Sequence, residues 1–357
     1  MQLIPYSLYP TFIRPLLFLL DAETAHGVII NSAKFMSKNP WKTLFSQTVA
    51  FRPVQMMGLQ FKNPVGLAAG LDKNGDAIDF FGALGFGHIE VGTVTPKEQP
   101  GNPKPRMFRI KGAQGIINRM GFNNLGVDYL VENLKKRTYD GVLGVSIGKN
   151  ETTPIEKAVD DYLICMDKVY QYADYIAVNV SCPNTPDLTK LQARDPLIKL
   201  LEPLKKRQAE LKGKFNKYVP LVVKIGPDLS DEAIESICQV CLDLGIDGMT
   251  CTNTTTRRDI IHGMEHASEW GGLSGEPLRV ASTQTLVKVN SILKGKIPLI
   301  GVGGVSNPVS AREKLENGAT LVQLYSSLVY RGPAVIKNIV NKDKAELNSN
   351  SFDTYKA

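Results

Sequence analysis

The sequence contains little cysteine, histidine or tryptophan. Among 357 residues there are 5 cysteines, 4 histidines and 2 tryptophans. An odd number of cysteines, in a chain of this length for which we expect no signal peptide, favours a reducing compartment over a disulfide-stabilised secreted fold. Cys238 and Cys241 form a C-x-x-C motif, but they lie in a helical pattern without a second pair or a nearby histidine. We therefore expect buried helix thiols there and no metal site.

Long hydrophobic runs and blocks of basic residues are also missing. No stretch approaches the roughly 20 apolar residues that a membrane-spanning helix needs. The formal net charge is +7, but basic residues are scattered among acidic ones, so we expect no nucleic-acid partner. Anionic ligands or an anionic membrane surface would equally explain the charge. The apolar fraction of 43% is that of a globular protein, long enough for one large domain or two ordinary ones.

The first 42 residues differ from the rest of the chain. Residues 9–20 are rich in Leu, Ile and Phe, and residues 21–38 place a set of apolar side chains near one helical face: Ala25, Val28, Ile29, Ala33 and Met36. Asp21 is the expected N-cap. We interpret residues 1–42 as an amphipathic helical hairpin in a membrane interface, with basic residues near anionic headgroups: Lys34, Lys38, Lys42 and Arg52. The alternative is a helix pair packed on the domain itself.

From residue 64 onward, short apolar runs alternate with helical patterns, as is typical of parallel βα units. Eight candidate strands follow one another: 65–69, 88–92, 143–147, 175–179, 221–225, 248–252, 298–302 and 320–324. Eight units favour a closed (β/α)8 barrel over an open sheet. We therefore expect an α/β protein in which residues 43–342 form this barrel. An N-terminal helical hairpin extension precedes the barrel in the chain, and a polar tail over 343–357 follows it. An insertion over 95–118 is expected to carry a hairpin that turns about Gly112.

In such barrels the chemistry collects at the carboxyl ends of the strands. After the fourth strand, two carboxamides, Asn179 and Asn184, flank Cys182. Carboxamides can read the edge of a planar heterocycle, and a thiol can accept a proton, so we expect proton abstraction from a bound ring. Lys224 ends the fifth strand among apolar residues, and we favour a ligand contact over a structural ion pair. Glycine turns at 271–275 and 301–304 predict a phosphorylated cofactor.

Six stretches in this order resemble class 2, quinone-dependent dihydroorotate dehydrogenases over nearly the whole chain: 66–73, 92–96, 118–124, 182–186, 224–228 and 272–275. The resemblance implies FMN bound by Ala69, Gly70, Lys73, Thr93, Ser146, Asn179, Lys224, Thr252, Gly275, Gly304, Tyr325 and Ser326. It implies dihydroorotate bound by Lys73, Asn118, Arg119, Met120, Gly121, Phe122, Asn179, Asn184, Asn253 and Thr254.

The resemblance also implies a mechanism for pyrimidine synthesis. Cys182 would take the proton from C5 of dihydroorotate while C6 gives hydride to the flavin, and Thr185 and Phe122 would shape the proton's exit. Ubiquinone or menaquinone would then enter a tunnel between the first two helices, with His26 and Arg109 among its polar groups. The expected location is the cytoplasmic face of a bacterial inner membrane, to which the protein would bind peripherally.

Two positions depart from the family's pattern. Cys182 stands where class 2 members usually have serine, and a thiol ionises more easily than an alcohol. Ser146 stands where an asparagine that touches the flavin is usual, so one flavin hydrogen bond is lost or passes through water. Two rival interpretations remain at this point. One is a soluble-type FMN barrel that reduces fumarate or NAD, and the other is a non-catalytic barrel that binds membranes.

Overall fold

The protein folds around a closed barrel of eight parallel strands. The computed structural model describes residues 6–185 and 187–342. Around the barrel the strands follow the order β10-β12-β13-β3-β4-β7-β8-β9. Their bounds are β3 Val65–Leu67, β4 His88–Val94, β7 Val142–Ile147, β8 Tyr175–Asn179, β9 Leu221–Ile225, β10 Gly248–Cys251, β12 Leu299–Val302 and β13 Ala319–Leu324. The predicted (β/α)8 barrel is confirmed, with strand bounds within two residues of those expected.

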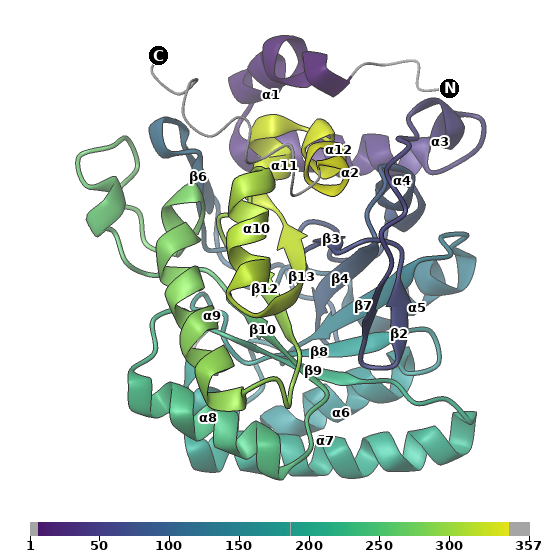
Figure 1. Cartoon of the computed structure of the whole chain (residues 1–357), viewed down its shortest axis with the longest axis vertical. Coiled ribbons are helices and arrows are strands. Elements are labelled where there is room, and N and C mark those ends of the chain that lie inside the picture. The colour runs from purple at the N-terminus through teal and green to yellow at the C-terminus, as the bar shows by residue number, and fades with distance from the viewer. Residues whose placement is uncertain (1–5, 186, 343–357) are drawn as a thin grey trace.

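Helices cover the outside of the barrel (Figure 1). They are α4 Ile78–Ala83, α5 Gly126–Lys136, α6 Ala158–Val169, α7 Arg194–Phe215, α8 Asp231–Asp243, α9 Arg279–Leu293, α10 Pro308–Glu316, α11 Ser326–Arg331 and α12 Ala334–Asn341. Cys238 and Cys241 lie buried in α8, as expected from the helical pattern. In the described part of the chain, no group of three or more His, Cys, Asp and Glu side chains could hold a metal ion.

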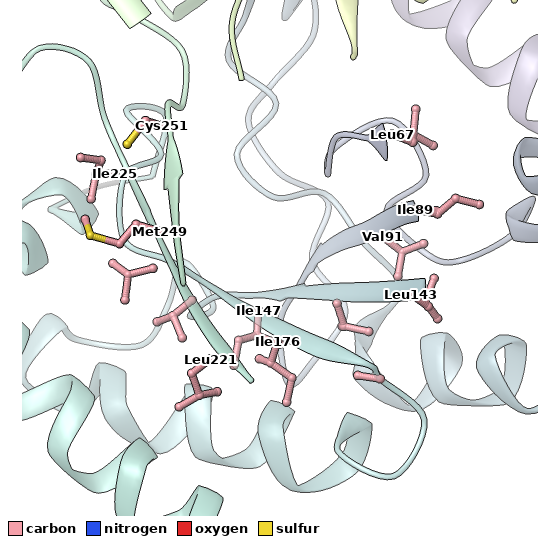
Figure 2. Close-up of a cluster of buried hydrophobic side chains, with 14 of the residues drawn as sticks. Leu67, Ile89, Val91, Leu143, Ile147, Ile176, Leu221, Ile225, Met249 and Cys251 are labelled. Atoms are coloured by element: carbon pink, nitrogen blue, oxygen red, sulfur yellow. The ribbon is translucent and has the colours of Figure 1, made fainter. Parts of the chain in front are cut away.

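Side chains alternate between the two faces of each barrel strand, as the two-residue period of a strand requires. Figure 2 shows the outer set, which includes Ile176, Leu221 and Ile225, packed between strands and helices. The neighbouring residues Tyr175, Ala177 and Val222 belong to the separate cluster inside the barrel. On β8 and β9 this alternation turns Asn179 and Lys224 inward at the carboxyl ends of the strands. The strand period thus positions the polar groups of the site.

A hairpin that we did not predict closes the amino-terminal end of the barrel. Strands β1 (Val54–Met56) and β2 (Leu59–Phe61) pair antiparallel. Met56 and Phe61 are buried in the cluster inside the barrel, and the Phe61 ring packs edge-on against His88 at 5.3 Å. The barrel is therefore plugged by apolar side chains at this end, and its interior opens toward the carboxyl ends of the strands.

A small antiparallel sheet stands over the carboxyl end of the barrel. Strands β5 (Met107–Ile110) and β6 (Gly115–Asn118) form the hairpin predicted about Gly112. Strand β11 (Gly272–Gly275), expected only as a glycine turn, pairs with β6 as a third strand. This pairing brings Asn118 beside Gly272, 154 positions along the chain, with 3.5 Å from Asn118 Nδ2 to Gly272 O. The sheet therefore joins two of the predicted ligand-binding segments.

The N-terminal segment is helical and lies at the same end of the molecule as α11 and α12, whereas α7 crosses the opposite end (Figure 1). It contains a π-helix at Tyr9–Ile13, α1 at Arg14–Leu19, α2 at Ala22–Met36 and α3 at Trp41–Leu44. Asp21 is the N-cap of α2, accepting bonds from the amides of Glu23 and Thr24. Val28, one of the apolar residues expected near one face of α2, is exposed, so it adds to the apolar surface of the segment.

The segment also leaves large apolar side chains at the surface. They are Leu8, Phe12, Ile13, Leu16, Leu19, Leu20, Val28, Phe35 and Trp41. Over residues 6–185 and 187–342, no helix combines the length and the apolar character that crossing a membrane requires. The tail predicted over residues 343–357 lies outside the described residues.

Candidate active site

A cavity opens at the carboxyl ends of the barrel strands, under the sheet formed by β5, β6 and β11. Most of the residues expected at the site line it: Ala69, Gly70, Lys73, Thr93, Asn118, Met120, Gly121, Phe122, Asn179, Cys182, Asn184, Lys224, Thr252, Asn253, Thr254, Gly275, Gly304, Tyr325 and Ser326. These residues come from distant parts of the chain. The closed strand order brings them together.

Cys182 lies on the loop after β8 and is 8% exposed. Burial raises the pKa of its thiol above the usual value, although the backbone amides of Asn184 and Thr185 and the charge of Lys224 act in the opposite direction. The thiol is therefore harder to ionise here than in water, which the sequence did not show. The other four cysteines are buried, and none of them is among the described residues that line the cavity.

Lys73 follows β3 and brings a cation into the cavity. Its ammonium has no hydrogen-bond or ion-pair partner within the part of the chain that the structure describes. Burial, together with the charge of Arg106, lowers the pKa of Lys73 to about 8. A half-buried cation without a partner is costly, so the site is poised for an anionic ligand. A thiolate at Cys182 would act in the opposite direction and raise the pKa of Lys73, because the two groups share the cavity.

A cluster of amides and hydroxyls lies at the ends of β4, β8 and β10. Asn179 Nδ2 donates to Thr93 Oγ1 over 2.8 Å, and Asn253 Nδ2 lies 3.3 Å from Asn179 Oδ1. Asn184, which also lines the cavity, donates from Nδ2 to the carbonyl of Asn118 over 2.9 Å. The buried Oδ1 of Asn184 has no hydrogen-bond partner among the described residues, so it is free to accept a bond from a ligand.

Glycine turns close the opposite end of the cavity. Gly303 and Gly304, after β12, adopt positive φ values of 110° and 72°. A Cβ atom on Gly304 would lie 2.3 Å from Cβ of Arg279, so only glycine allows this close approach of the turn to α9. Tyr325 and Ser326, which follow the neighbouring strand β13, line the cavity beside this turn. A turn without side chains offers its backbone to a ligand, as phosphate-binding turns do.

Family comparison agrees with this arrangement. The family model described as dihydroorotate dehydrogenase matches residues 53–347. A Psychromonas ingrahamii protein named dihydroorotate dehydrogenase (quinone) is 57% identical over 328 residues, which cover 92% of this chain and 98% of that protein. A protein of the same name from Vibrio cholerae is 58% identical over 323 residues, covering 90% of this chain and 96% of the relative.

The chain belongs to the dihydroorotate dehydrogenase family. Solved structures agree with the sequence relatives. The crystal structure of the Eimeria tenella dihydroorotate dehydrogenase in complex with ferulenol is 36% identical, with a TM-score of 0.86. The match covers 96% of this chain and 94% of that one. The ligand-free enzyme from the same organism matches with a TM-score of 0.85.

Five of the residues expected from the dihydroorotate dehydrogenase pattern are not among the described residues that line the cavity: Ser146, Arg119, Thr185, His26 and Arg109. The Ser146 hydroxyl lies 2.9 Å from Thr93 Oγ1, so it touches a cavity residue from behind. Arg119 pairs with Glu269 at 2.6 Å. His26 bonds the carbonyl of Leu71 at 2.8 Å, and Arg109 donates to the carbonyl of Leu20 over 2.8 Å.

Four further lining residues belong to segments that the sequence analysis singled out: Ala68 in the stretch 66–73, Ser274 in the turn 271–275, and Val302 and Gly303 in the turn 301–304. The other lining residues were not expected at the site: Gln114, Glu276, Leu278, Val305, Ser306, Gln323, Ser327 and Tyr330. Gln323 could have been predicted from the sequence as a site residue, because a polar residue in the otherwise apolar end of a predicted strand is a recognisable signal. Tyr330 was not, because only the packing of α11 turns its ring toward the cavity. Its hydroxyl donates to the carbonyl of Gly115 over 2.8 Å.

Proposed function

We propose that this protein oxidises (S)-dihydroorotate to orotate, with FMN as the hydride acceptor and a membrane quinone as the final electron acceptor, in pyrimidine synthesis. One observation carries the proposal: a single cavity contains the Cys182 thiol, the unpaired Lys73 ammonium and the carboxamides of Asn179 and Asn253. Dihydroorotate needs a base for its C–H proton, a cation for its carboxylate and amides for its ring. The relatives' name, dihydroorotate dehydrogenase (quinone), supports the same reaction.

The residues present fit FMN. Gln323 Oε1 and Ser327 Oγ belong to cavity residues and are buried without hydrogen-bond partners among those described, so both can meet a polar ligand. The turn at Gly303 and Gly304 suits a phosphate. The flavin would be held by Ala69, Gly70, Lys73, Thr93, Asn179, Lys224, Thr252, Gly275, Gly304, Tyr325 and Ser326, with Ser146 acting through Thr93. When bound, FMN supplies the hydride acceptor and the route of electrons to the quinone.

The protein's own residues then act on dihydroorotate. Lys73 pairs with the carboxylate, which relieves the cost of its half-buried, unpaired charge. Asn118, Asn184, Asn253 and Thr254 hold the ring, and the loop at 119–122 covers it. Cys182, as a thiolate, removes the proton from C5. Burial of this thiol also excludes water, which keeps the proton transfer within the site.

The proton leaves past Phe122 and Thr185 in this proposal. Phe122 has a positive φ of 53°, and an added Cβ on Gly148 would lie 3.0 Å from its ring. The ring thus closes against the end of β7 and shields the cavity. Movement of the Phe122 ring would open the cavity near Cys182, so this side chain controls when the thiol exchanges its proton with solvent.

In this proposal the quinone enters between the first two helices and approaches the cavity from there. Tyr330 lines the cavity and packs edge-on against Phe18 with 5.5 Å between ring centroids. The Arg109 guanidinium lies 4.4 Å from the Phe18 ring centroid. A continuous contact therefore joins the first helices to the cavity wall. His26, whose pKa burial lowers to about 4, offers a neutral polar group at the same end of the molecule.

The exposed apolar side chains of the N-terminal segment support peripheral membrane binding. Leu16, Leu19 and Phe35 lie on helices grouped at one end of the molecule (Figure 1). Apolar surface of this kind, with basic residues nearby, suits the interface of an anionic bilayer. We place the protein on the cytoplasmic face of a bacterial inner membrane. The double variant Leu16→Glu/Leu19→Glu should lose vesicle binding, whereas Ile164→Glu on α6 should not. Equal binding of both variants would contradict this placement.

Flavin analysis and acceptor assays test the proposed function. The purified protein should be yellow, should release FMN on denaturation, and should lose its flavin absorbance when dihydroorotate is added without oxygen. Turnover should then require ubiquinone or menaquinone analogues as electron acceptors. Neither fumarate nor NAD should replace them. A protein that stays colourless after reconstitution would contradict the FMN assignment. Turnover with fumarate or NAD would instead indicate a soluble-type enzyme.

A further inference from the structure

A polar layer lies inside the barrel and reaches the floor of the cavity, which its member Gln323 lines. It consists of His88 and Glu90 from β4, Tyr175 from β8 and Gln323 from β13, all buried. Glu90 Oε2 accepts one bond from the Tyr175 hydroxyl and one from Gln323 Nε2, each over 2.9 Å. Burial raises the pKa of Tyr175 well above its usual value and lowers that of His88 to about 3, so both side chains are neutral. Glu90 is therefore the acidic group of this layer, and its ion-pair partner is Lys224.

The chain makes room for this layer with glycine. A Cβ atom on Gly66 would lie 2.1 Å from the His88 ring, and one on Gly144 would lie 2.1 Å from the Tyr175 ring. Any other residue at these positions would overlap the rings. Barrel interiors are usually filled by branched apolar side chains, and a buried carboxylate is costly without partners. Three strands thus contribute side chains to the layer. Packing alone does not explain why one of these side chains is a carboxyl group.

The free oxygen of Glu90 is directed to a cavity residue. Glu90 Oε1 has no hydrogen-bond partner in the described chain, and it lies 3.8 Å from Lys224 Nζ. The Lys224 side chain is 6% exposed and lines the cavity, whereas the Glu90 side chain is 0% exposed. The lysine therefore lies between the carboxylate and the cavity. The two strands are not neighbours in the barrel, so the pair spans its interior.

We propose that Glu90 is a positioning residue that holds Lys224 at the cavity floor and partly offsets its charge, and thereby sets the reduction potential of the bound flavin. This inference rests on the proposed function, because it requires FMN in the cavity. Reduction adds electron density to the flavin, so a nearby cation favours the reduced form and a nearby anion disfavours it. The pair thus keeps Lys224 in a fixed position at the cavity floor. It also weakens the effect of the lysine's positive charge on the reduction potential of the flavin.

The midpoint potential of the bound FMN, measured by anaerobic dye equilibration, tests the proposal. Glu90→Gln removes the charge but keeps the size and an acceptor oxygen for Tyr175 and Gln323. The midpoint should become more positive, with at least a tenfold gain in the preference for reduced over oxidised FMN. For a two-electron couple, tenfold corresponds to about 30 mV. Lys224→Met should shift the midpoint in the opposite direction.

Tyr175→Phe is the matched control, because it removes a hydrogen bond to the same carboxylate without changing the charge. Its preference for reduced FMN should stay within about threefold of wild type, although its stability falls. If Glu90 were merely structural, Glu90→Gln would behave like Tyr175→Phe. A midpoint in Glu90→Gln that is unchanged, or more negative, overturns the proposal.

A second variant keeps the proposal testable if Glu90→Gln does not hold FMN. Glu90→Asp retains the charge but withdraws it from Lys224 by one methylene, so the midpoint should again rise, by less than in Glu90→Gln. An unchanged or lower value contradicts the proposal. Failure of the proposed function would be seen first and separately. In that case the wild-type protein would not bind FMN, or dihydroorotate would not bleach it.

Discussion

Glu23 of α2 and Arg106, just before β5, form a bidentate ion pair that connects the N-terminal segment to the loops over the active site. Arg106 Nε lies 3.0 Å and Nη2 lies 2.7 Å from the two Glu23 carboxylate oxygens. The same guanidinium donates to the carbonyl of Asn102 over 2.6 Å. Asn102 in turn donates to the carbonyl of Asn184 over 3.1 Å. The helix that faces the proposed membrane is thereby connected to the loop that follows Cys182.

Glu23→Gln should destabilise the protein by roughly 3 kcal/mol, because it leaves the Arg106 guanidinium buried without its carboxylate. Chemical denaturation at neutral pH measures the change. Glu132→Gln removes an exposed carboxylate paired with Lys135 and is the matched control, for which we expect no measurable loss. Equal effects of the two substitutions would show that the Glu23–Arg106 pair does not anchor the helix.

The pH dependence of turnover should separate Lys73 from Cys182. Burial lowers the pKa of Lys73 to about 8, so in the free enzyme this cation is present below pH 8 and lost above it. KM for dihydroorotate should therefore rise above about pH 8. Burial raises the pKa of Cys182 above its usual value, so kcat should keep increasing through the same range as the thiol ionises. A KM that is constant from pH 6 to pH 9.5 would contradict the role of Lys73.

His26 should make the protein less stable in acid. Burial lowers its folded-state pKa to about 4 from an ordinary value of 6.5, so between these values the unfolded chain binds a proton that the folded chain does not. Stability is therefore lost as pH falls from 6.5 to 4, by about 3 kcal/mol for this group. The stability difference between wild type and His26→Gln, from urea unfolding, should shrink by that amount between pH 7.5 and pH 4.

The matched control is His262→Gln, which removes an exposed loop histidine. A difference between wild type and His26→Gln that stays constant from pH 7.5 to pH 4 would show that His26 is not held neutral by burial.

Much of the barrel could be predicted because its strands carry two independent signals. The apolar runs predict the strands, and the carboxyl ends of barrel strands are where ligands bind. Asn179 and Lys224 could therefore be placed at the site from the sequence alone. The family motifs then assigned roles to individual residues. Cys182 could be recognised as the expected base for the same reason, because it follows a predicted strand at the ligand-facing end.

The remaining elements carried weak or misleading signals. The turn between β1 and β2 places Met57 at a positive φ of 56°, where glycine or asparagine would have marked a hairpin. Strand β11 consists of Gly272–Gly275, residues of low strand propensity that indicated a turn. The position of Ser146 behind Thr93 depends on strand register, which the sequence does not specify. Glu90 was not predicted, although a carboxylate within an apolar strand is a recognisable signal.

The most direct test of the account is the rate at which dihydroorotate bleaches the FMN of Cys182→Ala under anaerobic stopped-flow conditions. Wild-type protein should bleach quickly, whereas Cys182→Ala should retain FMN and orotate binding but bleach at least a hundredfold more slowly, because no base removes the C5 proton. Cys182→Ser should fall between the two. Bleaching of Cys182→Ala at the wild-type rate would contradict the assignment of Cys182 as the base.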